Sequence, residues 1–594
     1  MATTPTTKLV NEPAFAVDDS LRGFVAANPS VALLPGCCRV VVRSGGEEKS
    51  RSKVALLCGG GSGHEPAFGG FVGRGLLDAA VAGDVFASPA AGHARAALEH
   101  LSRDVGVLLF LINYTGDRLN FGLAVERWRA APQACPVEVV VVGEDTALSA
   151  LDQSAGRRGL AGVLLVLKIA GAMAELGWSL SAIKETAEKV SANLGTIGLC
   201  TSPCSVPGAP PTFTLAAGEL GLGVGVHGEP GVATLAQLSA RDAVRVMLGH
   251  TTDSQSATRL DLQPNVDVAL LVNNLGGLSA LEMNVVVGEA LAWFQSSRSC
   301  GRVLRVYTGT MMTSLEMRGV SISVLKLQHP DWLDWLDADT TAVGWPGHRV
   351  VPTPPLDVQD RRTPAQCEHA RRLDSVVVDS ASISDEDAAL LERAVRAALE
   401  ALVAAEQRLD ELDRTAGDGD CGSTFARGAK ALLSALDEKR LPVDNPAQLL
   451  AEISRIWESG TGGTSGALYA IFFSSASKAL KTLATLTSLA GSLRAGLDAV
   501  MFYGRARPGD RTMVDALSAA ADVLERRASS KESLELADWR HAVEAAKGAA
   551  ESTASMRAKA GRASYVAPSH WTRPDPGAVG LALWMEALCR GASP

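Results

Sequence analysis

Short, uninterrupted runs of apolar residues recur along the first part of the chain and alternate with segments of helical periodicity. Runs of this length, rich in leucine and β-branched side chains, are typical of strands covered on both faces. Strands that alternate with helices indicate an α/β sheet. The runs predicted as strands are residues 54–58, 105–112, 137–142 and 160–167.

A second α/β unit is predicted to begin near Gly195. Further apolar runs follow at residues 266–272 and 303–308, again between helical patterns. Residues 8–345 are therefore interpreted as one lobe of two α/β subdomains.

The pattern changes at residues 346–382, where several prolines and mixed charges show no periodicity, as in a linker. Ser384 followed by Asp387 then fits a capping box at a helix start. Apolar residues next recur at helical spacing, and strand patterns almost disappear. Residues 383–592 are predicted to form an all-α domain. The stripe consists of Leu391, Val395, Leu399, Leu402, Leu409 and Leu412.

Composition narrows the choice of partners. The 594-residue chain has a net charge of −9 and no long basic run, which argues against nucleic acid. An anionic ligand would then need metal ions and backbone donors. The ten cysteines are scattered, and no signal peptide or membrane-spanning segment is recognisable, so we expect a cytosolic protein with no membrane partner.

The first candidate site is the glycine-rich turn CGGGSGHEP at residues 58–66. Glycines at the carboxyl end of a strand let the backbone turn and expose its N–H groups to a small polar ligand. His64 would lie beside such a ligand. The alternative is a turn that is rich in glycine for packing reasons.

Two further residues sit in similar surroundings. Asp117 follows the predicted strand 105–112, and His227 lies between glycines in GVHGEPG. With His64 they form a candidate acid–base and nucleophile set. The alternative is that each histidine is an ordinary surface or structural residue.

The second candidate site is the loop LDRTAGDGDCGST, which holds Asp413, Asp418 and Asp420. Clustered carboxylates suit Mg²⁺ or Ca²⁺, although an exposed acidic turn has the same pattern. The letters also match GxGxxG, but the motif follows a helix and is rejected as a dinucleotide fingerprint. The spacing excludes an EF-hand, and no P-loop is present.

Other helix starts in the all-α domain are candidates for anion binding. Residues 459–466 form a Gly/Ser/Thr turn before an apolar helix, and residues 508–513 and 574–577 are predicted helix starts capped by Asp510 and Asp575. Taken singly, these turns fit capping or close helix crossings. Taken together with the acidic loop, they favour a shared polyphosphate–metal site.

The motifs GGGSGHEP, NYTGD, GVHGEPG, AGDGDCGST, PGDRTM, GRASY and PDPGA occur in an order that resembles the single-chain dihydroxyacetone kinases, and most of all the animal form of that family. The resemblance runs from about Lys8 to the end of the chain. It implies a substrate-binding K domain followed by an ATP-binding L domain built as a barrel of antiparallel helices.

The resemblance also implies roles in the K domain. His227 would attack the ketone carbon of dihydroxyacetone and form a hemiaminal, which a polyol such as glycerol cannot do. Asp117 would take the proton of the reacting hydroxyl, with help from His64. Gly61, Ser62 and Gly63 would cradle the substrate.

In the L domain the resemblance implies that Asp413, Asp418 and Asp420 hold two Mg²⁺ ions on the phosphates of ATP. The implied substrates are dihydroxyacetone and D-glyceraldehyde. A second activity that splits FAD into AMP and cyclic FMN is also expected, with Mn²⁺ as a further candidate metal, as is a homodimer. The implied nucleotide contacts are Asp418, Gly419, Asp420, Cys421, Ser423, Thr424, Thr464, Ser465, Gly504, Thr512, Met513, Arg562, Asp575, Pro576 and Gly577.

One position departs from the family pattern. A lysine usually precedes NYTGD, and this chain has Ile112 there. Losing a charged hydrogen bond costs on the order of 1.5–3 kcal/mol, so the hypothesis is a weakened kinase. The rival interpretation is a carbonyl-binding regulatory protein that has lost turnover, against which the complete set of acidic residues weighs.

Overall fold

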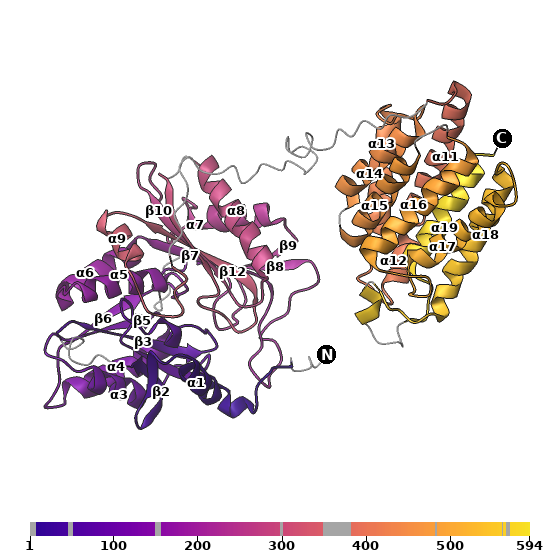
Figure 1. Ribbon diagram of the computed structural model, residues 1–594. Coiled ribbons are helices and arrows are strands. Elements are labelled where there is room, and N and C mark those ends of the chain that lie inside the picture. Colours follow the sequence, from indigo (N-terminus) through magenta and orange to yellow (C-terminus); the bar gives the residue numbers. More distant parts are fainter. Residues whose placement is uncertain are drawn as a thin grey trace. The chain divides into compact units, whose positions relative to one another are not determined.

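The computed structural model describes residues 7–44, 52–148, 156–297, 301–347, 382–461, 463–480, 484–560, 562–565 and 571–593. The chain divides into two compact units, Met1–Asp360 and Arg361–Pro594 (Figure 1). This division falls within the segment predicted as a linker, of which residues 348–381 lie outside the described residues.

The first sheet of the N-terminal unit has six strands in the order β1-β2-β4-β3-β5-β6. The glycine-rich strand β3 lies in the middle, parallel to both β4 and β5, while β2 pairs antiparallel with β1 and β4. The strands predicted at 54–58, 105–112 and 137–142 are confirmed, but β3 continues to Ser62, so the first part of the predicted glycine-rich turn belongs to the strand. The bounds are β1 Val31–Leu34, β2 Cys37–Arg43, β3 Ala55–Ser62, β4 Ala79–Val85, β5 Val107–Ile112 and β6 Val137–Val142.

The second sheet also has six strands, in the order β11-β10-β12-β7-β8-β9. Its pairs are antiparallel except for β10 with β11. Its first strand, β7, begins at Leu194, next to the predicted start of the second α/β unit, and the predicted runs 266–272 and 303–308 are β10 and β11. The bounds are β7 Leu194–Ser202, β8 Glu219–Leu222, β9 Ala233–Ala236, β10 Val268–Asn274, β11 Val303–Gly309 and β12 Arg318–Lys326.

Helices cover both faces of the first sheet, which explains why its central strands are apolar along their whole length. In β5, Leu108 and Phe110 join the core on one face, and Leu109 and Leu111 join the core on the other. The helices of this unit are α1 Ala16–Ala27, α3 Ala91–Leu101, α4 Thr115–Arg129, α5 Val163–Glu175, α6 Leu180–Ala192, α7 Ala240–Thr251, α8 Ala280–Ser296 and α9 Asp331–Asp337.

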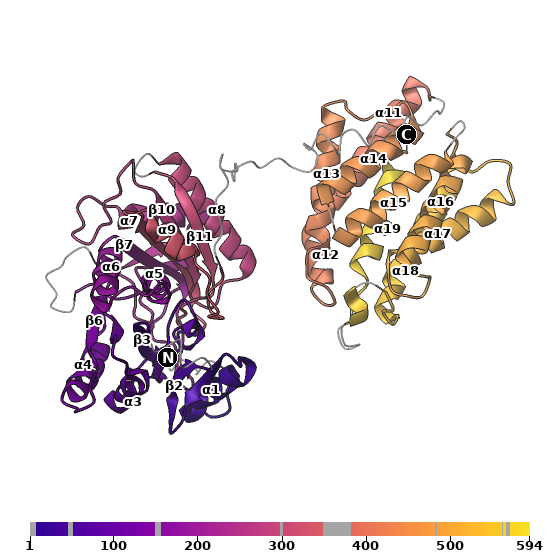
Figure 2. The ribbon, with the colours of Figure 1, turned by 60° about the vertical axis from the view of Figure 1, so that its left-hand side comes forward.

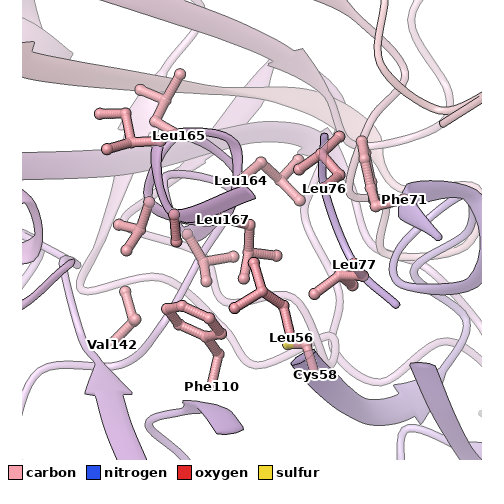
Figure 3. Packing of buried hydrophobic residues seen from close by; sticks show 14 of the residues in the cluster. Leu56, Cys58, Phe71, Leu76, Leu77, Phe110, Val142, Leu164, Leu165 and Leu167 are labelled. Carbon is pink, nitrogen blue, oxygen red and sulfur yellow. The ribbon is translucent and has the colours of Figure 1, made fainter. Parts of the chain in front are cut away.

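The strand predicted at residues 160–167 is wrong, because this run enters helix α5. Every residue of α5 from Val163 to Ala174 is buried, so the helix lacks the polar face by which a surface helix is recognised. A short run that is apolar on all sides fits a buried strand and a buried helix equally well. The core around α5 includes Leu56 and Phe110 of the first sheet (Figure 3). It also includes Leu271 of the second sheet.

Among its described residues the second unit contains helices and connecting loops but no strand, as predicted (Figures 1 and 2). Of the predicted apolar stripe, Val395, Leu399, Leu402 and Leu409 are buried in one core. Ser384 caps the first helix by accepting from the backbone N–H of Asp387. The helices are α11 Asp385–Ala404, α12 Glu406–Asp413, α13 Cys421–Asp437, α14 Pro446–Thr461, α15 Gly463–Ala479, α16 Leu486–Gly504, α17 Met513–Ala528, α18 Leu536–Ser552 and α19 Pro576–Gly591.

Among the helices that the structure describes, none combines the length and the apolar character that crossing a bilayer requires.

The buried lysine of α5 predicts a dependence of stability on pH. Lys168 is fully buried, its Nζ donates to the carbonyl oxygen of Trp335 at 2.8 Å, and burial lowers its pKa from 10.5 to about 8. Between these two values the unfolded chain binds more protons than the folded chain, so the contribution of Lys168 to the free energy of unfolding rises with pH.

Lys168→Met should remove the pH-dependent contribution of Lys168 to the free energy of unfolding. The difference in free energy of unfolding, wild type minus variant, should increase by up to about 3 kcal/mol as the pH rises from about 8 to 10.5, measured by chemical denaturation. Lys189→Met, which changes a lysine on the exposed face of α6, serves as the control and should show no such trend. A difference for Lys168→Met that stays constant with pH would contradict the prediction.

Candidate functional site

His64 lies in the turn after β3 and is 2% exposed. Gly63 before it has a φ of 96°, a left-handed conformation that favours glycine. The Nδ1 atom of His64 is 2.8 Å from the carbonyl oxygen of Thr313. Because a carbonyl only accepts, Nδ1 carries the proton and Nε2 keeps a lone pair. Burial, and then the nearby His227, lower the pKa of His64 to about 3, so the ring is neutral at pH 7.

His227 reaches the same place from the second subdomain, in the loop between β8 and β9. Its ring centroid lies 4.9 Å from that of His64 and 4.4 Å from that of Tyr114. The backbone N–H of His227 donates to Glu229 at 2.9 Å, and its ring Nδ1 lies 3.5 Å from the other oxygen of the same carboxylate. Glu229 therefore orients Nδ1, and Nε2 is the ring nitrogen available to a ligand.

Glu229 is itself held in the charged form. Burial alone would raise its pKa, but the hydrogen bond and charge of His227 and the charge of Arg158 outweigh burial and lower the pKa to about 2. Arg158 is fixed in turn, since its Nε donates to Asp145 at 2.7 Å and its Nη2 donates to the carbonyl oxygen of Gly223 at 2.8 Å. Asp145 thus positions Arg158, Arg158 helps to keep Glu229 charged, and Glu229 orients the ring of His227.

Asp117 lies in the first turn of α4, directly after β5, and is 4% exposed. Because β5 runs parallel to β3, the two strands end at the same edge, as the positions of Asp117 and His64 in the sequence predicted. A Cβ atom built on Gly60 would lie 3.9 Å from the Oδ2 atom of Asp117. Burial raises the pKa of Asp117, against the opposing effects of a hydrogen bond from Ser88 and the charge of His227, and makes the carboxylate a stronger base.

The predicted cradle of Gly61, Ser62 and Gly63 is tightly packed. A Cβ atom on Gly61 would come within 2.8 Å of the backbone nitrogen of Ala87. The hydroxyl of Ser62 donates to a backbone carbonyl, and the N–H of Gly63 donates to Glu65 at 3.0 Å. A cavity of about 350 Å³ borders residues 60–62 on the side of α1, but the three candidate catalytic side chains lie outside its lining.

Ile112 is the last residue of β5 and is 3% exposed, within the core that surrounds α5. A Cβ atom on Gly159 would approach its Cγ2 atom to 2.5 Å. The side chain that replaces the family lysine is therefore an integral part of the packing beside the site.

In the second unit the acidic loop folds back onto the end of α12. Asp413, the last residue of this helix, accepts hydrogen bonds from the backbone N–H groups of Gly419 and Asp420 at 2.9 and 3.0 Å. One oxygen each of Asp413, Asp418 and Asp420 lies within 4.8 Å of the others. Three carboxylates this close repel one another unless a cation lies between them, and an all-oxygen donor set suits Mg²⁺. The residues present fit the expected metal.

A cavity of about 360 Å³ opens beside this cluster, a size within the usual range for small-molecule sites. The start of each of the helices α13, α15, α17 and α19 contributes to its wall, so several helix N-termini face one space, an arrangement that favours an anion. The predicted contacts that line it, besides Asp413, are Asp418, Asp420, Cys421, Thr424, Ser465, Thr512, Met513, Asp575, Pro576 and Gly577.

The remaining predicted contacts differ in their placement. Gly419, Ser423 and Gly504 do not line the cavity, and the N–H of Ser423 donates instead to Asp410 at 3.0 Å. The side chains of Thr464 and Arg562 lie outside the described residues.

The predicted cap at Asp510 is wrong. Thr512 caps α17, accepting from the N–H of Val514 at 3.1 Å and donating its own N–H to Asp515 at 2.8 Å, because the helix begins two residues later than the Pro-Gly turn suggests. Asp510 accepts instead from the N–H of Arg507. At α19 the predicted cap Asp575 is confirmed, and it accepts from the N–H of Ala578 at 2.9 Å.

The sequence analysis missed several residues that shape these sites. Glu229 had a local signal, since it stands two residues after His227 in the same glycine turn. Thr313 had none, because it meets His64 from 249 residues away. Tyr114 and Arg511 stand next to motif residues that were singled out, yet no charge or spacing pattern distinguished them.

Comparison with known proteins gives two family matches, a Dak1 domain over residues 22–344 and a DAK2 domain over residues 415–590. The chain is 44% identical to triokinase/FMN cyclase from Homo sapiens over 98% of both chains. Its structure resembles the dihydroxyacetone kinase from C. freundii in complex with AMP-PNP and Mg²⁺, with a TM-score of 0.64, 32% identity and coverage of 98% of this chain and 99% of that one.

A second solved structure, of another kind of protein, resembles part of the chain. The dihydroxyacetone kinase operon co-activator DhaQ matches 56% of this chain over 99% of its own length, with a TM-score of 0.51 and 27% identity.

An α/β domain followed by an all-helical domain, each matched by its own family model in the same order, defines a two-domain kinase. The chain belongs to the single-chain dihydroxyacetone kinase family, as its motifs predicted.

The acidic cluster predicts a stabilising effect of Mg²⁺ that depends on its carboxylates. At a Mg²⁺ concentration one hundred times Kd, a folded protein gains about 2.7 kcal/mol. Asp418→Asn should leave the metal-free melting temperature unchanged or raised, because it relieves repulsion, and should lose most of the gain with Mg²⁺, as measured by thermal unfolding. Glu400→Gln, at an exposed position of α11, should keep the full gain. An undiminished gain in Asp418→Asn would contradict the assignment.

Proposed function

We propose that this protein transfers the γ-phosphoryl group of ATP to a hydroxyl of dihydroxyacetone or D-glyceraldehyde. The observation that carries the proposal is the state of the two histidines. His227 has Nδ1 beside a charged carboxylate and Nε2 available, and His64, 4.9 Å away, is neutral with its own Nε2 available. This is the arrangement that a nucleophile and a neighbouring neutral hydrogen-bond acceptor require.

In this mechanism the lone pair of His227 Nε2 forms a bond to the carbonyl carbon of the triose while the C=O π bond breaks, and the oxygen takes up a proton from solvent water to give a hemiaminal. The ring becomes more positive as this bond forms. Glu229, 3.5 Å from Nδ1, stays ionised and stabilises that charge. The covalent bond then holds the substrate in one position, which lowers the entropic cost of the later transfer.

The proton of the attacking hydroxyl goes to Asp117. Its carboxylate is buried, its pKa is raised, and its Oδ1 atom has no hydrogen-bond partner among the described residues, so it can accept from a substrate. His64 assists as a neutral hydrogen-bond acceptor through Nε2, since its Nδ1–H is committed to Thr313 and its lowered pKa keeps the ring uncharged. Both groups sit at the edge where β3 and β5 end.

For the nucleotide we propose that Asp413, Asp418 and Asp420 hold two Mg²⁺ ions. The metal supplies charge neutralisation for the phosphates, the main requirement of phosphoryl transfer. The starts of α13, α15, α17 and α19 supply N–H donors and their dipoles. In a chain of net charge −9, these local sources of positive potential offset the overall field.

We also propose the second activity, the splitting of FAD into AMP and cyclic FMN, in the same cavity. FAD presents a pyrophosphate to the metal cluster, as ATP does, but contains no carbonyl that must react with His227. The name of the human relative, triokinase/FMN cyclase, supports this assignment. From the family resemblance we further propose a cytosolic homodimer, Mn²⁺ as an alternative metal for the FAD reaction, and domain limits of 8–345 and 383–592.

A regulatory protein that binds the triose without turnover is the second candidate, and the likeness of part of the chain to the co-activator DhaQ favours it. That likeness covers 56% of this chain. The second unit keeps its three carboxylates together beside a cavity of nucleotide size, which favours the kinase.

His227→Ala should separate the two proposed activities. We expect ADP release with dihydroxyacetone or D-glyceraldehyde to fall by at least about a hundredfold, because the covalent anchor is lost, while the rate of AMP release from FAD stays unchanged. His541→Ala, at an exposed position of α18, is the control and should change neither rate. If both activities disappear in a folded His227→Ala protein, the assignment of two separate sites is wrong.

Ile112→Lys tests the departure from the family pattern. If the lysine restores a charged contact, kcat/KM for dihydroxyacetone should rise by roughly tenfold to a hundredfold. The melting temperature should fall, because Ile112 is 3% exposed and packed against Gly159. Ile112→Met, which keeps an apolar side chain, should leave kcat/KM unchanged. An unchanged or lower kcat/KM in Ile112→Lys would reject the hypothesis of a weakened kinase.

A further inference from the structure

Arg511 is an unusual residue in the helical unit, because its guanidinium is buried and incompletely bonded. The side chain is 1% exposed, and the backbone has a φ of 62°, in the left-handed region. Its Nη2 donates to the carbonyl oxygen of Arg573 at 2.7 Å. Its Nε and Nη1 atoms have no hydrogen-bond partner within the described part of the chain. The side chain lines the cavity beside the acidic cluster.

The nearby acidic residues do not account for this arrangement. Asp515 accepts hydrogen bonds from the N–H groups of Gly509 and Thr512, and the Oδ1 atom of Asp575 accepts from the N–H of Ala578. In the ranges that the structure describes, no carboxylate oxygen lies within 4.0 Å of the nitrogen atoms of Arg511. These carboxylates therefore attract the guanidinium of Arg511 only over a longer distance, and they accept no hydrogen bond from its Nε or Nη1 atom.

Arg427 shows what a satisfied arginine in the same wall looks like. Its Nε donates to the carbonyl oxygen of Gly460, and its Nη2 donates to the hydroxyl of Thr424 and the carbonyl oxygen of Thr461. Arg427 thus closes contacts between two helices. Arg511 differs, because two of its N–H donor atoms have no partner among the described residues and its side chain lines a cavity.

A buried, unpaired charge is costly, and proteins normally pair such groups or use them on a ligand. A guanidinium presents its N–H groups in a planar fork that fits two oxygens of a phosphate. The cavity wall already combines helix N-termini with a metal-type carboxylate cluster, and both of these favour a phosphate-bearing ligand.

We propose that Arg511 is a phosphate-binding residue of this cavity, donating from Nε and Nη1 to phosphate oxygens of the nucleotide. The inference rests on the proposed function and deepens it: the protein supplies a fixed cation of its own, from the α17 side, in addition to the metal ions on the acidic side. Because ATP and FAD share a pyrophosphate, Arg511 serves both reactions.

The test measures binding to the full chain by calorimetry in the presence of Mg²⁺, with AMP-PNP, ADP and adenosine as probes. Arg511→Met keeps an unbranched side chain without charge or donors. It should weaken AMP-PNP and ADP by roughly tenfold to a hundredfold and leave adenosine unchanged. Arg511→Lys should give an intermediate loss, because a lysine restores the charge without the fork. Arg494→Met, which removes an arginine from a surface ion-pair group, should bind all three probes as the wild type does.

A second measurement separates binding from structure. If Arg511 serves the ligand, Arg511→Met without nucleotide should melt at the same or a higher temperature than the wild type, because an unpaired buried charge has gone. Unchanged affinity for AMP-PNP, or an equal loss for adenosine and AMP-PNP, would overturn the inference. If the wild type itself fails to bind AMP-PNP with Mg²⁺, the proposed function fails as well, whereas wild-type binding that Arg511→Met retains in full overturns only the role of Arg511.

Discussion

The packing of one apolar core across both halves of the N-terminal unit is the constraint on which its chemistry depends. His64 belongs to the first subdomain and His227 to the second, and their ring centroids lie 4.9 Å apart beside a single core in which α5 joins residues of both sheets. Backbone bonds fix the same contact at the site itself, where the N–H of Thr313 donates to the carbonyl oxygen of His64 and the N–H of Leu315 donates to that of Gly63. The apolar core and these two backbone hydrogen bonds together hold the two histidines at this distance.

Desolvation then sets the protonation of the groups that the core brings together. Burial lowers the pKa of His64 and raises that of Asp117, so one residue stays neutral and the other becomes a better base. The pKa of Glu229 is lowered although the residue is buried, because the effects of His227 and Arg158 outweigh burial and keep the carboxylate ionised. Similar side chains thus acquire different proton affinities from their partners.

Much of this arrangement could be predicted from the sequence, and what could not has identifiable causes. Apolar runs located β3, β5, β6, β10 and β11. The parallel strands β3 and β5 end at the same edge, which is why their ends pointed to His64 and Asp117, whereas His227 was indicated only by the glycines on either side of it. Residues 160–167 were misread because a helix buried on all sides has no polar face. Thr313 and the free donors of Arg511 depend on contacts between distant segments, which no local pattern encodes. The start of α17 was misplaced because Asp510 and Thr512 are both good caps and only the tertiary structure decides between them.

Under the proposed function, the histidine pair also answers a problem of selectivity that shape alone solves poorly. Glycerol and dihydroxyacetone are almost the same size, and a pocket of apolar and backbone groups discriminates weakly between molecules that differ by so little. A step that requires a carbonyl carbon makes the discrimination between the two molecules much stronger, because a polyol cannot form the bond to His227. The discrimination then comes from the chemistry of one ring nitrogen, and that nitrogen is available only because Glu229 holds the other. Selectivity in this domain would therefore depend on the support of His227 more than on the fit of the cradle around it.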